Sequence, residues 1–212
     1  MRIGRGLATA ASAILFIVAP MRGIFAAELT RLQIEQKLVG AQGKPIDLSN
    51  LDLSGVDLSG LNMHGADFFS TKLTGAKLAR SDLSGANFTR ADLQDADFSG
   101  ASMKAATLYA ALLDGANFTN ADLSTARIIG GGKDVSFRNA KLIGADLGAD
   151  PANQGMVPVR AELPDANFDG ADLTQANLTH AVLTGASFTA AVVTGARFDY
   201  AVLDGSNLSL GR

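Results

Sequence analysis

The chain has no cysteine, no tryptophan and only two histidines among its 212 residues. Without cysteine it forms no disulfide scaffold and has no site for the lipid anchor of a lipoprotein. The formal net charge of −3 also differs from the basic balance that nucleic-acid binding surfaces require. We therefore expect neither a disulfide-rich domain nor a basic nucleic-acid binder.

A five-residue unit repeats from Ile46 to Leu208, and residues 85–89 (GANFT) show it plainly. Thirty large apolar residues mark the centres of the units, eighteen of them leucine and eight phenylalanine. The residue two before the centre is alanine in twenty-two units, and the residue two after it is glycine in thirteen. A period of five fits neither a helix nor a simple strand, so the chain must turn every five residues. Glycine after the centre suits a turn that needs a positive φ.

These units resemble the pentapeptide-repeat family, whose consensus A-(N/D)-L-X-X is matched over about three quarters of the chain. The resemblance implies an all-β fold, a right-handed quadrilateral β-helix with four pentapeptides per coil. It also implies that the centre and the small residue point inward while the other three point to solvent. A narrow interior filled by large and small side chains explains the leucine, phenylalanine and alanine pattern. Residues twenty apart should then stack at strand spacing, about 4.8 Å.

The N-terminus, residues 1–27, is predicted to be a secretory signal peptide. Basic residues precede an uncharged apolar stretch at 7–21, and Ala26 and Ala27 follow it. The stretch is shorter than the ~20 residues that span a bilayer, which favours cleavage over a retained anchor. Cleavage after Ala27 would place bulky Phe25 where a small residue is preferred, so the anchor is kept as an alternative. We expect a periplasmic or secreted bacterial protein without membrane contact after cleavage.

Residues 28–45 are predicted to form a short amphipathic helix and a linker. Leu32 and Leu38 lie among charged residues, and Gly40 begins a stretch that ends the helix. We expect this helix to cap the first coil, because an uncovered strand edge invites uncontrolled pairing. The β-helix should follow over residues 46–210.

Two interruptions break the repeat. Residues 130–134 are predicted to contain a four-residue insertion that bulges from a corner, because the flanking centres Ile128 and Phe137 lie nine residues apart. Residues 149–160 belong to a second interruption, predicted to be a loop or a distorted coil. Loops on repeat scaffolds often carry specific contacts. Here the flexible glycines and the lack of aromatic or charge clusters favour tolerated insertions.

No active site is expected. His64 and His180 fall at outward positions many coils apart, so they cannot share a metal ion within one molecule. Aspartates directly before the centres belong to the repeat and lie in no enclosing pocket. We therefore predict that the protein is not an enzyme and that it has no catalytic residues, no metal site and no cofactor.

One candidate interaction surface is a line of outward side chains. Three residues that each follow a centre by one position lie at multiples of twenty along the sequence. They are Phe69, Tyr109 and Ile129, and they are flanked by Arg90 and Arg127. This stripe is either a partner contact or ladder packing, since aromatic and β-branched pairs also stabilise sheets.

A second candidate surface lies near the C-terminus and suggests self-association as a homodimer. Val182 and Val202 should stack on one face, and Val192 should lie on another, all in a position that is usually polar. We expect the last coil to be uncapped, and end-to-end association is then the expected geometry.

Together these features predict an exported non-enzymatic module for protein interaction or structure, with an unidentified protein partner and no nucleic acid. The resemblance offers an alternative, because gyrase-protecting family members mimic DNA in shape and charge. Asp52, Lys72 and Asp92 should form a ladder of alternating sign, which dilutes the acidic stripe that mimicry needs. A further alternative is a solenoid spacer on a membrane anchor.

Overall fold

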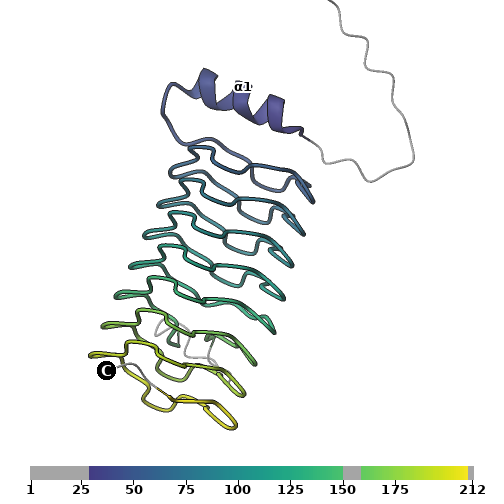
Figure 1. The fold of residues 1–212 in the computed structure, drawn as a ribbon. Coiled ribbons are helices and arrows are strands. Elements are labelled where there is room, and N and C mark those ends of the chain that lie inside the picture. The colour runs from purple at the N-terminus through teal and green to yellow at the C-terminus, as the bar shows by residue number, and fades with distance from the viewer. Residues whose placement is uncertain (1–28, 150–158, 210–212) are drawn as a thin grey trace, which may run out of the picture.

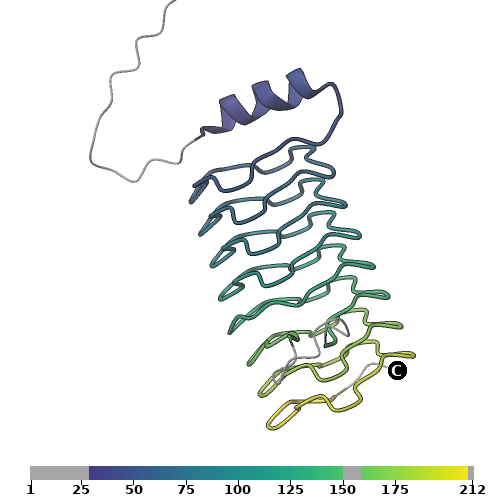
Figure 2. The same cartoon turned by 180° about the vertical axis from the view of Figure 1, so that it is seen from behind.

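The computed structural model describes residues 29–149 and 159–209, and these form a stack of coils beneath one helix. The helix, α1 (Arg31–Ala41), lies across the N-terminal end of the stack (Figure 1). Below it, isolated parallel bridges replace continuous strands, and bridge partners in the first coils lie twenty residues apart, as in Asp47↔Asp67. The described residues form eight coil levels, the number of bridge residues in the row from Asp47 to Arg197. Figure 2 shows the same stack from behind.

Four rows of bridge residues run along the stack, and each is named by its first member: the Asp47, Asp52, Asp57 and Asn62 rows. The rows follow one another in chain order, so each complete coil crosses all four before the next coil begins. Each regular coil therefore contains four pentapeptides, as the family resemblance implied.

A tight turn separates neighbouring rows. After the centre Phe68, the N–H of Thr71 donates to the Phe68 carbonyl at 3.1 Å, and Ser70 between them has a φ of 54°. A positive φ at the third position is the requirement of a type II turn, which explains the glycines there. Residues with side chains also adopt it, including Arg80 at 57° and Arg90 at 60°. Bonds between coils hold these turns in place, since the Arg90 N–H donates to the Tyr109 carbonyl at 2.8 Å.

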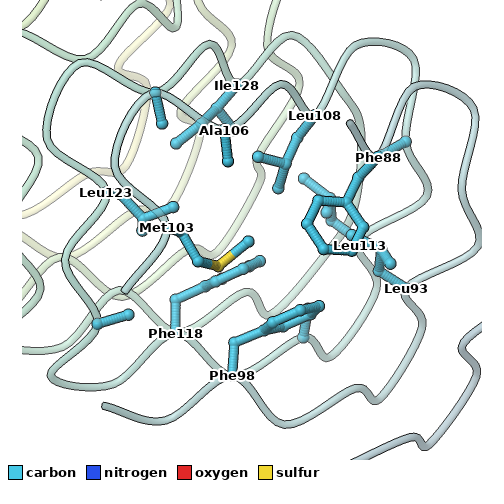
Figure 3. Close-up of a cluster of buried hydrophobic side chains, with 14 of the residues drawn as sticks. Phe88, Leu93, Phe98, Met103, Ala106, Leu108, Leu113, Phe118, Leu123 and Ile128 are labelled. Atoms are coloured by element: carbon cyan, nitrogen blue, oxygen red, sulfur yellow. The ribbon is translucent and has the colours of Figure 1, made fainter. Parts of the chain in front are cut away.

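The interior is filled by the centre and small residues, nearly all of them fully buried. Figure 3 shows centres from neighbouring coils meeting there. In the Asp57 row, five phenylalanine rings stack between Phe98 and Phe188, with successive centroids 4.9–5.1 Å apart. Offset ring stacking adds about 0.5–1.5 kcal/mol per pair beyond the burial of apolar surface. The phenylalanines therefore tie these coils together along one side of the interior.

Helix α1 is fixed to the first coil by one buried and one charged side chain. Ile34 is fully buried in the core, and Thr30 and Gln33 form a capping box at the start of the helix. The Arg31 guanidinium donates to the carbonyls of Asp57 and Ser59, both at 3.1 Å. These contacts set the position of α1 over the first coil.

The first interruption differs from its prediction. Instead of an insertion, the chain is one residue short, because Leu112 bridges to Gly131, nineteen residues on (112 to 131). Gly132 takes the place of a centre, as the bond from the Leu113 N–H to the Gly131 carbonyl shows. No apolar side chain marks this unit in the sequence, so the gap was wrongly interpreted as inserted residues. The shortcut needs glycine, since a Cβ on Gly132 would lie 2.4 Å from the backbone carbonyl carbon of Leu113.

The second interruption adds residues at the following coil level. Gly131 bridges to Glu162, thirty-one residues on (131 to 162), which is eleven more than the regular twenty. The N–H of Ala161 donates to the Leu147 carbonyl at 3.4 Å where the chain rejoins the coil. Most of the predicted segment 149–160 lies outside the described residues. Both interruptions fall between the Asp47 row and the Asp52 row, so one corner of the rod contains both.

The predicted charge ladder is present on the Asp52 row. Asp52 bridges to Lys72 and Lys72 to Asp92, and the Lys72 Nζ lies 4.0 Å from an Asp52 carboxylate oxygen. The Lys72 side chain is 65% exposed and the Asp52 side chain 31%, so solvent screens the ion pair, and it contributes at most about 1 kcal/mol. The alternating signs leave this part of the face without a continuous acidic stripe.

Candidate functional site

The turns that join the Asp47 row to the Asp52 row form the most distinctive surface of the described residues. Both interruptions lie there, and so do the outward aromatic side chains. We call this surface the aromatic corner. Its principal side chains are Phe69, Arg90, Tyr109, Ile129, His180 and Tyr200.

The structure brings only part of the predicted stripe together. The Arg127 guanidinium carbon lies 5.2 Å from the centre of the Tyr109 ring, a cation–π contact, and its Nε lies 4.0 Å from an Asp146 carboxylate oxygen. Tyr109 is therefore held in place by a charged neighbour on the next coil. Phe69 is half-buried two coils away, and Arg90 is exposed on the level between them.

Ile129 contradicts its prediction, since it is fully buried instead of pointing outward. The cause is the short coil, which has two residues where a regular unit has three between the centre and the next bridge residue. Gly132 provides no side chain at the neighbouring centre. Ile129 is buried without belonging to the main core cluster, and it lines the hollow described below. The stripe therefore has two outward aromatic residues on these coils instead of three outward apolar residues.

An aromatic pair that the sequence reasoning missed lies further along the same corner. The rings of His180 and Tyr200 stack with their centroids 4.9 Å apart and their planes 13° apart. Tyr200 is 80% exposed, and both residues have a positive φ, at 62° and 59°. The spacing of twenty between two turn residues is the signal that could have identified this pair.

A hollow indents the corner at the short coil, and we call it the corner notch. It encloses about 420 Å³, within the range of ~300–1,000 Å³ that ligand pockets occupy. Its floor is apolar, with Leu112 49% exposed beside it, and the charged side chains among its described lining residues are Arg160 and Glu162. Its lining residues are Ala110, Ala111, Leu112, Ile129, Gly130, Gly131, Val159, Arg160 and Glu162.

One residue that lines the notch has a buried polar side-chain atom without a hydrogen-bond acceptor. The Nε of Arg160 is buried and makes no hydrogen bond, and it is the one such side-chain atom among the described residues. The Oε1 of Glu162 is 3.5 Å away, which is too long for a good hydrogen bond. A buried donor without a partner costs about 1–3 kcal/mol, so this arrangement lowers the stability of the fold at this corner.

The valines of the second candidate surface lie where the repeat placed them. Val182 bridges to Val202 in the Asp52 row, and Val192 bridges to Asp172 in the Asn62 row. Val192 is 38% exposed, whereas Val182 and Val202 are half-buried. In the last described coil the centres Phe198 and Leu203 are also only partly buried. Apolar surface is therefore exposed around this end of the described stack.

Local hydrogen bonds lower the pKa of three aspartates at bridge positions of the first coil. Hydrogen bonds from the Ser54 hydroxyl and its N–H lower the pKa of Asp52, and Ser49 and Ser59 lower the pKa of Asp47 and Asp57 in the same way. Across residues 29–149 and 159–209, no group of three or more histidine, aspartate or glutamate side chains could hold a metal ion. The same residues include no helix long and apolar enough to cross a membrane.

Stacked coils of four pentapeptides define a β-helical solenoid. The family model for pentapeptide repeats matches the chain in eight copies, over residues 46–75, 66–104, 101–130 and 171–209. These ranges include more than half of the 212 residues, so the chain belongs to the pentapeptide repeat family. Membership implies the right-handed β-helix, and the bridge register agrees with it.

Three solved structures are similar to parts of this chain. A pentapeptide repeat protein from the thylakoid lumen of Arabidopsis thaliana is 30% identical over 51% of this chain and 66% of its own, with a TM-score of 0.35. HetL, involved in heterocyst differentiation regulation in Nostoc, is 25% identical over 85% of this chain and 95% of its own, with a TM-score of 0.32. QnrB1, a plasmid-mediated fluoroquinolone resistance protein, is 21% identical over 76% of this chain and 83% of its own, with a TM-score of 0.48. No curated protein gives a significant match.

Proposed function

We propose that the protein is an exported, non-enzymatic interaction module that binds a protein partner through the aromatic corner. The observation that carries this proposal is the concentration of unusual features on one of four corners. The outward aromatic residues Phe69, Tyr109 and Tyr200 lie there, together with both interruptions and the corner notch. Tyrosine and arginine are enriched in protein interfaces and among the residues that dominate their binding energy.

The geometry of the corner suits a protein partner better than a small molecule. Its side chains are distributed along successive coils, so an extended segment could contact several of them together. Tyr109 is held by Arg127, which lowers the entropic cost of ordering it on binding. The rigid coils present these side chains with fixed spacing, about 4.8 Å per level.

A matched pair of arginine substitutions tests the use of this corner. Arg90 and Arg80 both occupy turn positions with a positive φ, and both are exposed, but Arg80 lies on the opposite corner. Arg90→Ser should weaken the capture of a cross-linked partner from expressing cells, as should Phe69→Ser with Tyr109→Ser. Arg80→Ser should leave capture unchanged. If the double substitution lowers the melting temperature but not the capture of the partner, the corner supports the fold only.

Export is the second part of the proposal, and it rests on the basic, apolar and small residues of positions 1–27. Expression of the full chain, cell fractionation and mass spectrometry of the N-terminus test it. A soluble periplasmic form that begins near Ala27 or Glu28 is expected. A membrane-bound form beginning at Met1 would support the anchored spacer instead. A cytoplasmic form beginning at Met1 would contradict export and favour the gyrase-binding alternative.

We infer that α1 acts as a cap in this module. Arg31 bonds to two carbonyls of the first coil, and Ile34 covers its core, so the helix shields the first strand edges from pairing. Arg31→Ala should lower the melting temperature and increase aggregation on heating, as light scattering would detect. Lys37→Ala, an exposed change on the same helix, is the control. Equal behaviour of both variants would contradict the inference.

A further inference from the structure

We propose that the aromatic corner binds a proline-rich segment of the partner protein in the polyproline II conformation, with an acidic residue between two of its prolines. The two prolines pack on the rings of Phe69 and Tyr109, and the acidic side chain pairs with Arg90. This inference rests on the proposed function, because it takes the aromatic corner as the interaction surface and names the chemistry of the partner.

The three side chains come from three successive coils. Phe69 and Tyr109 each follow their centre by one residue, so they form one column at the corner, two coil levels apart. Thr89 holds the same position on the coil between them, and Arg90 follows it in the same turn. A complete described coil, residues 127–145, lies between this column and the coil of the second interruption. The column is therefore built by the regular part of the stack.

The spacing of the two rings along the rod selects the conformation of the ligand. Neighbouring coils are about 4.8 Å apart, so two levels place the two residues about 9.6 Å apart. A polyproline II helix rises about 3.1 Å per residue with three residues per turn, so residues i and i+3 lie on one side about 9.3 Å apart. Residues on one face of a β-strand are about 6.6 or 13.2 Å apart, and two turns of an α-helix rise about 10.8 Å. Polyproline II therefore matches the two rings best among the regular conformations.

The backbone of these coils also favours such a segment over an added β-strand. The N–H of Ser70 donates to the Thr89 carbonyl at 3.0 Å, and the N–H of Arg90 donates to the Tyr109 carbonyl at 2.8 Å. These groups are used within the stack, so a ligand strand would have to compete with bonds between coils. A proline-rich segment needs no such row of partners, because it binds by packing prolines on aromatic side chains.

Both rings are already restrained before a ligand arrives. The guanidinium carbon of Arg127 lies 5.2 Å from the centre of the Tyr109 ring, and Phe69 is half-buried. A proline-rich segment is similarly restrained, since the proline ring fixes φ. Association therefore orders few side chains on either partner, which reduces the entropic cost of binding.

The charge of the corner selects an acidic residue in the ligand. The side chain of Arg90 is exposed, and it makes no ion pair with a carboxylate of the described residues. It belongs to the coil between the two rings, so the residues between the two prolines pass nearest to it. An exposed ion pair changes affinity by only about two- to fivefold, but it distinguishes an acidic segment from a neutral one.

Fluorescence anisotropy with a labelled nonapeptide, Ser-Gly-Pro-Pro-Glu-Pro-Pro-Gly-Ser, tests the proposal on the protein as purified from expressing cells. We expect saturable binding. The peptide with alanine in place of every proline should bind about tenfold more weakly, because the preformed extended conformation is lost. The peptide with glutamine in place of glutamate should bind about two- to fivefold more weakly, because only the ion pair is lost.

Three substitutions locate the binding on the corner. Phe69→Ser should weaken binding about tenfold, whereas Phe69→Tyr keeps the ring and should bind as wild type does. Arg90→Gln should weaken the glutamate peptide about two- to fivefold and leave the glutamine peptide unchanged, because the two groups act as a pair. Arg80→Gln, an exposed change at the opposite corner, should affect neither peptide.

Absence of saturable binding, or equal affinity for the proline and alanine peptides, would overturn the inference. Equal losses for the glutamate and glutamine peptides in Arg90→Gln would overturn the pairing with an acidic residue. The peptide comparisons need no variant, so misfolding of Phe69→Ser leaves the test intact. The proposed function fails separately, when capture of the cellular partner is indifferent to Phe69 and Tyr109. Capture that depends on these rings but is not inhibited by the proline peptide would refute this inference alone.

Discussion

Two adjacent glycines should respond very differently to the same added methyl group. A Cβ on Gly132 would lie 2.4 Å from the Leu113 carbonyl carbon and 2.5 Å from the Asp114 nitrogen. A Cβ on Gly131 would meet only the Glu162 carbonyl oxygen, at 3.7 Å. Ordinary contacts begin near 3.4 Å, so Gly132→Ala overlaps backbone by about 1 Å and Gly131→Ala fits.

The overlap at Gly132 involves the main chain, which cannot move aside as a side chain can. To relieve it, the coils must separate and weaken the bonds from the Leu113 N–H to the Gly131 carbonyl and from the Gly132 N–H to the Glu162 carbonyl, 2.8 and 3.0 Å long. Overpacking costs about 1–3 kcal/mol and each hydrogen bond about 0.5–1.5 kcal/mol, so a loss of about 3 kcal/mol is expected.

Thermal unfolding followed by circular dichroism measures this difference. For a chain of this size about 1 kcal/mol shifts the melting temperature by about 2–4 °C, so Gly132→Ala should lower it by about 6–12 °C. Gly131→Ala should leave it within about 2 °C of wild type or raise it slightly. A fall of the same size in both variants would refute the assignment of Gly132 as a centre pressed against the preceding coil.

Three further predictions follow from the stack. Phe137→Ala should lower the free energy of unfolding, measured by urea titration, by about 3–5 kcal/mol. Phe198→Ala, in the partly exposed last described coil, should lower it clearly less. Equal losses in the two variants would contradict a stabilising role of the ring stack. The pKa of Asp52 is lowered in the folded state below its ordinary value of 3.8. The ionised Asp52 therefore stabilises the fold above that pH, and this stabilisation is lost as the pH falls through the folded pKa. The melting temperature should therefore fall on acidification below about pH 4, and a flat profile down to pH 2 would contradict this. Val182→Lys with Val202→Lys should convert a dimer into a monomer in light scattering, and a wild-type monomer would rule out self-association through these valines.

The regular parts of the fold were predictable because the repeat encodes them residue by residue. Leucine and phenylalanine at centres such as Phe98 predicted the buried interior, and the spacing of twenty predicted that Val182 lies beside Val202. The glycines after the centres predicted turns with a positive φ. These inferences succeed because every unit satisfies the same steric conditions.

The irregular parts were not predictable by the same reasoning. Gly132 is a centre without a side chain, so a count of large apolar residues does not include it. The shortened unit before Gly132 was therefore not recognised, and Ile129 was wrongly predicted to point outward. The His180–Tyr200 pair was not grouped with the predicted stripe because its members come from a different position of the unit. Tyr109 lies one residue after its centre, and Tyr200 lies two residues after its own centre. Both nevertheless belong to the turns between the Asp47 row and the Asp52 row. A map of all turn residues by row, including the polar ones, would have grouped them.

The continuous phenylalanine stack has a wider consequence for how this protein can change. Phe118, Phe137 and Phe168 remain stacked although nineteen residues separate the first two and thirty-one the next two. The distance between neighbouring coils along the rod therefore does not depend on the number of residues in each coil. Deletions and additions at a single corner are absorbed locally, while the opposite wall keeps its spacing. Such a scaffold can acquire new surface at one corner without altering the rest of its length.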